Sequence, residues 1–258
     1  MNLRRIAFGA AGAAGVVAVF EAVSRAGLVD ATALPPASVV LREAGKLAVD
    51  QEFLTDVGAT LKAWFGGLAL AVLVAVPLGV LLGSVPFLGT AARALVELLR
   101  PIPSVALIPL AIILFASPTQ MKMSLIFYAC TWPILINTLY ALRDVDPVAK
   151  ESLRAFGFGG PAVLWRVSLP SAAPFIATGI RIAASVALIV VISTELIAGG
   201  FNGVGIYLAD TQSGGGQTDL MLAGAVWAGV LGLLANLALL GLERVAFRWQ
   251  SARVEGIT

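Results

Sequence analysis

The sequence predicts an all-α membrane protein with six transmembrane helices. Of its 258 residues, 59% are hydrophobic and only 12% are charged, whereas a soluble domain carries about 25% charged residues. The mean hydropathy is +0.94. The apolar runs approach or exceed the roughly 20 residues that a helix needs to cross a bilayer, and they lack the ten-residue alternation of a membrane barrel. We therefore expect spanning helices.

The first apolar segment, Ile6 to Val23, follows the basic residues Arg4 and Arg5. A basic start, a short apolar region and small residues are also typical of a cleaved signal peptide. Glu21 weakens the interpretation as a membrane span. We favour a span because further apolar runs follow and no secreted domain does.

Five more spans and one long connection account for the rest of the chain. Residues 27–62 mix acids, bases and prolines, which indicates an external connection with a short amphipathic helix. Kinked helices are tolerated in membrane bundles because neighbours satisfy the freed backbone groups. The expected spans are Ala63–Gly83, a proline-interrupted run from Arg100 to Ala116, Ser124–Leu142, Phe175–Ala198 and Leu220–Phe247.

The positions of lysine and arginine predict the orientation of the spans. With the N-terminus inside, twelve of the seventeen basic residues lie in the cytoplasm, as the positive-inside rule requires. We expect a multi-pass protein of a prokaryotic cytoplasmic (inner) membrane with both termini inside. The predicted organisation is an N-terminal helix with its connection (1–57), a transmembrane core (58–247) and a cytoplasmic tail (248–258).

A polar loop at residues 144–174 separates the fourth and fifth spans. Asp146-Pro147 can start a helix that continues to Phe156, and the glycines from Gly157 onward can end it. Pro161 suits the first turn of a second helix, which Leu169-Pro170 is expected to stop. Two short helices joined at a glycine elbow predict a projection that can dock into a groove of another protein.

Residues of this loop follow a known spacing pattern. Glu151 is followed after five residues by Gly157, and after nine more come Val167, Ser168 and Leu169-Pro170. The pattern resembles the EAA motif of ABC importer permeases, although both alanines and the isoleucine of that motif are replaced. Further stretches resemble the permeases of nitrate, sulfonate and taurine importers: Arg100 to Pro103 with Ala106, Pro109-Leu110 and Phe115, Gly179 to Arg181, Glu195 to Ala198, and Gly203 to Gly205.

The resemblance implies a six-helix type I importer fold and a set of partners. These are a second permease subunit, as a homodimer or less favourably a heterodimer, two ATPase subunits, an external substrate-binding protein and the lipid bilayer, with no nucleic acid. ATP and magnesium would be used by the ATPase, and the loop would be its coupling helix. A sulfonate, taurine or nitrate is the favoured solute, while vitamin or pyrimidine precursors and aromatic acids remain open.

The resemblance and the loop pattern together define candidate coupling residues. Glu151 and Arg154 share a helical face, where they form either a solvated pair of little energetic value or a contact with the ATPase. Aromatic residues on a free cytoplasmic loop are unusual, and either local packing or a partner groove explains them. The full set is Glu151, Arg154, Phe156, Gly157, Phe158, Leu169 and Pro170.

Polar residues within the spans are candidates for the translocation pathway. An intramembrane carboxylate such as Glu195 is costly and faces a cavity or a partner. It either lines the pathway or pairs with Lys122 or Arg181 near the external end of its span, and Arg181 is expected too near the inner face for this. Serine and threonine in helices often bond their own backbone, which competes with a role in the pathway. The remaining candidates are Asn137, Thr131, Ser185 and Ser193.

A second class of function, a membrane enzyme or an ATPase-independent channel, has little support. The sequence lacks histidine, the usual metal ligand and general base, so we expect no metal site and no cofactor bound by this chain. Cys130, the one cysteine, can form no internal disulfide and is expected in the core. No GxxxxGK[ST] loop is present, so ATP hydrolysis is expected in a separate subunit.

Overall fold

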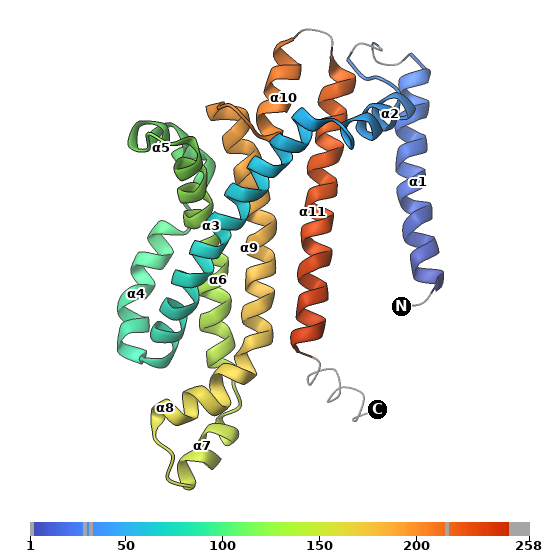
Figure 1. Cartoon of the computed structure of the whole chain (residues 1–258). Helices are drawn as coiled ribbons and strands as arrows, with labels where there is room; N and C mark the ends of the chain where they lie inside the picture. The colour runs from blue at the N-terminus through green and yellow to red at the C-terminus, as the bar shows by residue number, and fades with distance from the viewer. Residues whose placement is uncertain (1–2, 28–29, 31–32, 215–216, 248–258) are drawn as a thin grey trace. The chain divides into compact units, whose positions relative to one another are not determined.

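The computed structural model describes residues 3–27, 30, 33–214 and 217–247, and every regular element in these ranges is a helix (Figure 1). Five of these helices are long and apolar enough to cross a membrane, and a bent pair makes a sixth span if it is counted as one. The prediction of an all-α protein with six spans is confirmed. The expected tail 248–258 lies outside the described residues.

The chain forms two compact units. The first comprises residues 1–60 and 199–231, and the second comprises residues 61–198 and 232–258. Helices of the first unit are α1 (Leu3–Arg25), α2 (Ala37–Leu47), the start of α3 (Gln51–Ser84), α10 (Val204–Ser213) and the start of α11 (Thr218–Ala246).

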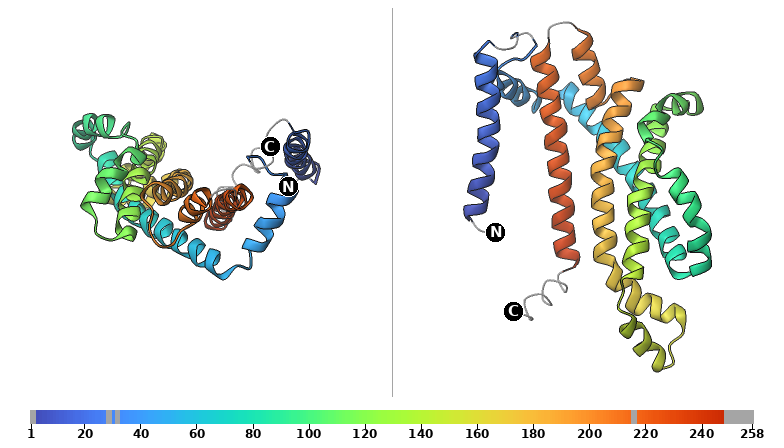
Figure 2. Two further views of the ribbon diagram at one scale, coloured as in Figure 1. Left: turned by 90° about the horizontal axis from the view of Figure 1, so that it is seen from above. Right: turned by 180° about the vertical axis from the view of Figure 1, so that it is seen from behind.

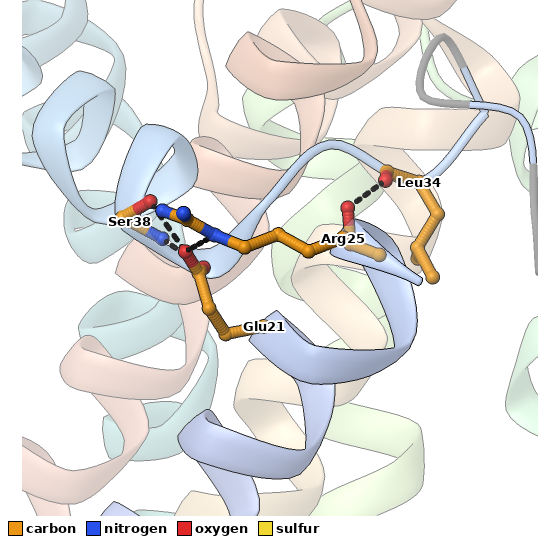
Figure 3. A network of polar contacts seen from close by, with 5 residues as sticks. Glu21, Arg25, Leu34 and Ser38 are labelled. Carbon is orange, nitrogen blue, oxygen red and sulfur yellow. Dashed lines mark hydrogen bonds and ion pairs between the residues drawn. The ribbon is translucent and has the colours of Figure 1, made fainter. Parts of the chain in front are cut away.

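Helix α1 is tied to α2 by the carboxylate of Glu21 (Figure 3). Glu21 accepts hydrogen bonds from the backbone N–H and the hydroxyl of Ser38, both at 2.9 Å, and pairs with Arg25 at 2.7 Å. The Ser38 N–H belongs to the first turn of α2, where backbone donors have no partner within the helix. The acid that weakened the prediction of a first span thus serves as a cap for the next helix.

The core of the first unit surrounds Phe53, which is 1% exposed. Its ring meets those of Tyr207 and Trp227 edge to face, with centroids 5.0 and 6.0 Å away. Helix α10 was not predicted from the sequence. Its first turn is held by α3 through two hydrogen bonds. The N–H of Gly203 donates to Asp56 Oδ1 at 2.8 Å, and the N–H of Val204 donates to the Thr60 hydroxyl at 2.9 Å.

The second unit is built on a long pair of helices, α6 (Pro118–Arg143) and α9 (Leu169–Ala198), which run side by side (Figures 1 and 2). Helix α3 packs closely on α6 through glycines. A Cβ atom at Gly67 or Gly79 would lie 2.6 or 2.7 Å from side-chain atoms of α6. Small residues allow the close backbone approach on which helix packing in membranes depends.

In place of the expected third span lie two apolar helices with a sharp bend between them, which make either a broken span or a re-entrant loop. Helix α4 (Pro86–Leu99) is followed by a 3₁₀ turn (Ser104–Leu107) and α5 (Ile108–Leu114), and the two halves are bent by 75°. The prediction of a single run starting at Arg100 was wrong, because residues 86–99 are already helical and apolar. Arg100 therefore lies at the bend between two apolar segments instead of at the start of a span.

Candidate functional site

The polar loop between α6 and α9 contains the expected pair of short helices. Helix α7 spans Pro147–Ala155, and the carboxylate of Asp146 accepts the N–H of Val148 at 2.9 Å as its N-cap. The ammonium group of Lys150 donates to the Leu142 carbonyl at 3.1 Å, which satisfies an acceptor near the end of α6. These bonds fix the first half of the loop to the helix that precedes it.

Helix α7 ends at the predicted glycine elbow. Gly157 has a φ of +83°, a conformation that glycine adopts without a steric penalty. Its N–H donates to the Arg154 carbonyl at 2.9 Å, and the N–H of Phe158 donates to the Leu153 carbonyl at 3.2 Å. This double closure is the Schellman motif that ends many helices. Gly157 is therefore required by the backbone conformation.

The second half of the loop departs from the prediction. Helix α8 (Gly160–Val163), a π-helical turn (Leu164–Ser168) and α9 follow each other without a break. The N–H of Leu169 donates to the carbonyl of Leu164, five residues back. The expectation that Leu169-Pro170 stops the second helix was wrong, because the chain stays helical through Pro170 and on to Ala198. The widened π turn directly before Pro170 accommodates this residue, which lacks an N–H.

The base of the loop is buried against the α6–α9 pair. Val145 and Val163 are 5% and 3% exposed. Val145 belongs to an apolar cluster with Leu142, Ala172 and Ile176. Leu164 and Val167 pack against this cluster, and the two short helices lie beyond it at the end of the second unit (Figure 1). The loop is thus a fixed projection of the helix pair.

The outer face of the loop carries exposed aromatic side chains. Phe156 is 82% exposed and Trp165 is 72% exposed. Phe158 is less exposed and lies under the guanidinium group of Arg166, 4.8 Å from the ring centroid. Glu151 and Arg154 are exposed as well. A surface with large apolar groups beside charged ones is typical of a protein-binding site. Trp165 was missed in the sequence, although a tryptophan in a polar loop carries the same signal as Phe156.

The candidate Glu195 forms a buried ion pair. Its carboxylate lies 2.8 Å from the ammonium group of Lys122, and the two side chains are 0% and 6% exposed. Lys122 is in the first turns of α6 and Glu195 in the last turn of α9, so the pair joins the ends of these helices remote from the loop. Of the two partners considered from the sequence, the structure selects Lys122. Arg181 instead lies 3.6 Å from Glu243.

The other polar candidates in the spans occupy different settings. The hydroxyls of Thr131 and Ser185 donate to backbone carbonyls one turn back, at 2.7 and 3.5 Å. Ser193 is half-buried on α9. Asn137 donates to the Pro133 carbonyl at 2.8 Å and also lines a cavity of about 420 Å³. Asn137 alone among these candidates is placed by the structure at a described cavity.

Comparison with known proteins identifies the chain. Residues 75–248 match the family of binding-protein-dependent transport system inner membrane components. The taurine transport system permease protein TauC of Escherichia coli is 31% identical over 91% of this chain and 86% of its own length. The nitrate import permease protein NrtB of Leptolyngbya laminosa is 27% identical over 74% of this chain and 68% of its own.

A solved structure supports the fold. The methionine ABC transporter MetNI in an inward-facing conformation has a chain with a TM-score of 0.66 and 20% identity, over 74% of this chain and 94% of that one. The relatives are permease subunits, which are not enzymes, and ATP is hydrolysed by a separate subunit. The chain belongs to the family of binding-protein-dependent transport system inner membrane components, as a multi-pass permease subunit of a type I ABC importer.

Proposed function

We propose that the loop from Asp146 to Ser168 is the coupling element that docks into the ATPase subunit. The observation that carries this proposal is the exposed Phe156 beside the positive-φ elbow at Gly157, on a projection whose base is buried. Exposed aromatics are costly in water and are the residue type most enriched at binding hot spots. Glu151 and Arg154, with the flanking Phe158, Leu169 and Pro170, would shape the docking surface and its attachment to α9.

The coupling step follows from how the loop is attached. Its first half is bonded to the end of α6 and its second half continues into α9 without a break. ATP-driven closure of the ATPase pair would therefore move both central helices of the permease together. We infer that this movement alternates access to the pathway between the two sides of the membrane, with the loop on the cytoplasmic side.

We propose a small solute with an oxyanion group as the cargo, such as a sulfonate, taurine or nitrate. The support is the likeness to permeases whose names specify taurine and nitrate, the first over 91% of the chain. An external substrate-binding protein would deliver the solute. Two copies of this chain would form the membrane part, with two ATPase subunits below them.

The docking proposal is tested by affinity purification of the tagged full chain from its native membranes in mild detergent. The parent chain should bring down an ATPase subunit, and the double variant Phe156→Ala/Trp165→Ala should lose it. The matched control is Phe201→Ala, which removes an aromatic ring that is 93% exposed elsewhere in the chain. An ATPase that stays bound to the double variant would show that another surface makes the contact.

The cargo proposal is tested by uptake of labelled taurine and nitrate in cells that carry the whole importer. Deletion of this permease should abolish uptake of at least one of them, and the gene in trans should restore it. Unchanged uptake of both after deletion, with loss of a solute that carries no oxyanion group, would refute the oxyanion class.

A further inference from the structure

A cavity of about 420 Å³ in the second unit lies where the broken span meets α6 and α9. Its walls come from residues 100–104 at the bend, from one face of α6 and from Ile182 and Val186 of α9. The volume is within the range of about 300–1,000 Å³ that is usual for small-molecule sites. No Asp or Glu lines this cavity in the described part of the chain.

Arg100 is the charged residue of the cavity. It follows the last residue of α4, at the 75° bend between two apolar helices. Whether these helices form a broken span or a re-entrant loop, Arg100 lies within an apolar stretch. An arginine at such a position is costly against lipid and faces a polar cavity or a partner. The ion pairs found among the described residues do not include Arg100.

The backbone directly before Arg100 is held by helix α6. The hydroxyl of Tyr128 donates to the carbonyl of Leu99 at 2.7 Å, which closes the end of α4 directly before Arg100. Tyr128 lines the same cavity. Its ring also meets that of Trp132 edge to face, with centroids 5.6 Å apart. The residue before Arg100 is thus bonded to a packed aromatic pair on α6.

The remaining polar groups of the cavity are mainly donors. The indole N–H of Trp132 is buried and has no hydrogen-bond acceptor, which is rare because an unsatisfied buried donor is destabilising. The amide of Asn137 uses one hydrogen for the Pro133 carbonyl and keeps the other. The hydroxyl of Ser104 completes the set. A cation with several N–H and O–H donors beside it is matched by an anion that offers several oxygen acceptors.

We propose that Arg100, Ser104, Trp132 and Asn137 form a binding site for the oxyanion group of the solute inside the permease itself. The inference rests on the proposed oxyanion cargo and assigns a place where the permease recognises it. The planar guanidinium group can bind two oxygens of a sulfonate or nitrate at once. The Trp132 N–H would then gain the acceptor that it lacks. Solute selectivity would reside in this subunit as well as in the binding protein.

The test is uptake of labelled taurine and nitrate into proteoliposomes that hold the whole importer. Arg100→Gln should raise the KM for uptake by about tenfold or more, since a hydrogen bond to a charged group is lost. Arg100→Lys keeps the positive charge but lacks the planar guanidinium group that binds two oxygens at once. It should therefore raise the KM less than Arg100→Gln does. Trp132→Phe is a milder second variant and should raise the KM several-fold. ATP hydrolysis stimulated by loaded binding protein should persist in each variant.

The matched control is Arg93→Gln in helix α4, which ends directly before Arg100. Arg93 lies 3.5 Å from Glu97 and does not line this cavity. Its KM should equal that of the parent. If the parent imports an oxyanion and both Arg100→Gln and Trp132→Phe do so with unchanged KM, the site is refuted while the proposed cargo stands. If the parent imports neither taurine nor nitrate, the proposed cargo fails first, and the site fails with it.

Discussion

The two ends of the α6–α9 pair are built in opposite ways. At one end Lys122 and Glu195 join the helices by an ion pair with almost no exposed surface. At the other end the same helices lead into a loop that exposes Phe156 and Trp165. Charged groups are buried at the Lys122–Glu195 end, whereas aromatic groups are exposed at the loop end. The difference fits a role in stability for the first end and the proposed binding of the ATPase subunit for the second.

This contrast also suggests how force passes through the subunit. A pair of helices joined at one end and pushed at the other moves as a unit, because the buried pair resists sliding of α6 past α9. The cavity at Arg100 lies beside α6 between these two ends, since its lining residues on α6 run from Tyr128 to Asn137. If the loop is the coupling element as proposed, a movement imposed on it would reach the proposed solute site through α6 and α9.

The largest expected effect is on the buried ion pair. Glu195→Gln leaves the Lys122 ammonium buried without its counter-charge and should lower the free energy of unfolding by about 3–5 kcal/mol. The double variant Lys122→Met/Glu195→Gln should recover most of the loss. Denaturant unfolding of the purified chain measures both. A loss in the double variant equal to the sum of the losses in Glu195→Gln and Lys122→Met alone would mean that the charges act independently of each other.

The next effect sharpens the comparison at the loop. Phe156→Ala should weaken ATPase binding by about 2 kcal/mol, roughly 30-fold, as expected for an aromatic hot spot. Its unfolding midpoint should match that of the parent, because the ring is 82% exposed. Binding is measured by titration of the purified ATPase onto the immobilised permease. A lower midpoint with unchanged binding would place Phe156 in the fold and not in the interface.

A smaller effect is expected at the elbow. Gly157→Ala should lower stability by about 1–2 kcal/mol, because an alanine is strained at a φ of +83° although the space around it is open. Gly159→Ala is the matched control, since Gly159 has a φ of −72° and should tolerate the methyl group. Thermal unfolding of the two variants side by side checks the difference. Identical midpoints would contradict a backbone role for Gly157.

The smallest effect is expected at the start of the loop. Asp146→Ala removes the N-cap of α7 and should lower stability by about 0.5–1 kcal/mol. Asp144→Ala removes an equally charged, exposed side chain outside the cap and should be neutral. Thermal unfolding again checks the pair. A neutral Asp146→Ala would mean that Pro147 alone is sufficient to begin the helix.

Features of the loop that depend on local residue types were predicted from the sequence. Features that depend on hydrogen bonds to more distant residues were not. Pro147 and Gly157 act within one turn of themselves, so the start and end of α7 were readable from residue types. Pro170 was misjudged because the π turn that accommodates it depends on hydrogen bonds five residues apart. Helix α10 was missed because its first turn is bonded to Asp56, almost 150 residues earlier in the chain.

The same distinction holds for the polar residues of the spans. Glu195 was recognisable as an intramembrane acid with Lys122 as its better-placed partner, but the direct contact of the two side chains follows from the packing of α6 on α9. Arg100 was placed at the cytoplasmic end of a span because its preceding residues include charges. Their arrangement on an apolar helix, followed by a sharp bend, is a tertiary feature. Trp132 and Asn137 likewise became candidates for one solute site only when the structure placed them with Arg100 around the same cavity.

The most direct test of the account is photo-cross-linking from the outer face of the loop. A photoreactive phenylalanine analogue at position 156 replaces Phe156 with little change in shape, and the importer is irradiated in its native membrane. Docking of the loop predicts an adduct with the ATPase subunit from position 156 and none from position 201, where Phe201 is also largely exposed. An intact complex that gives the ATPase adduct from position 201 and not from position 156 would contradict it.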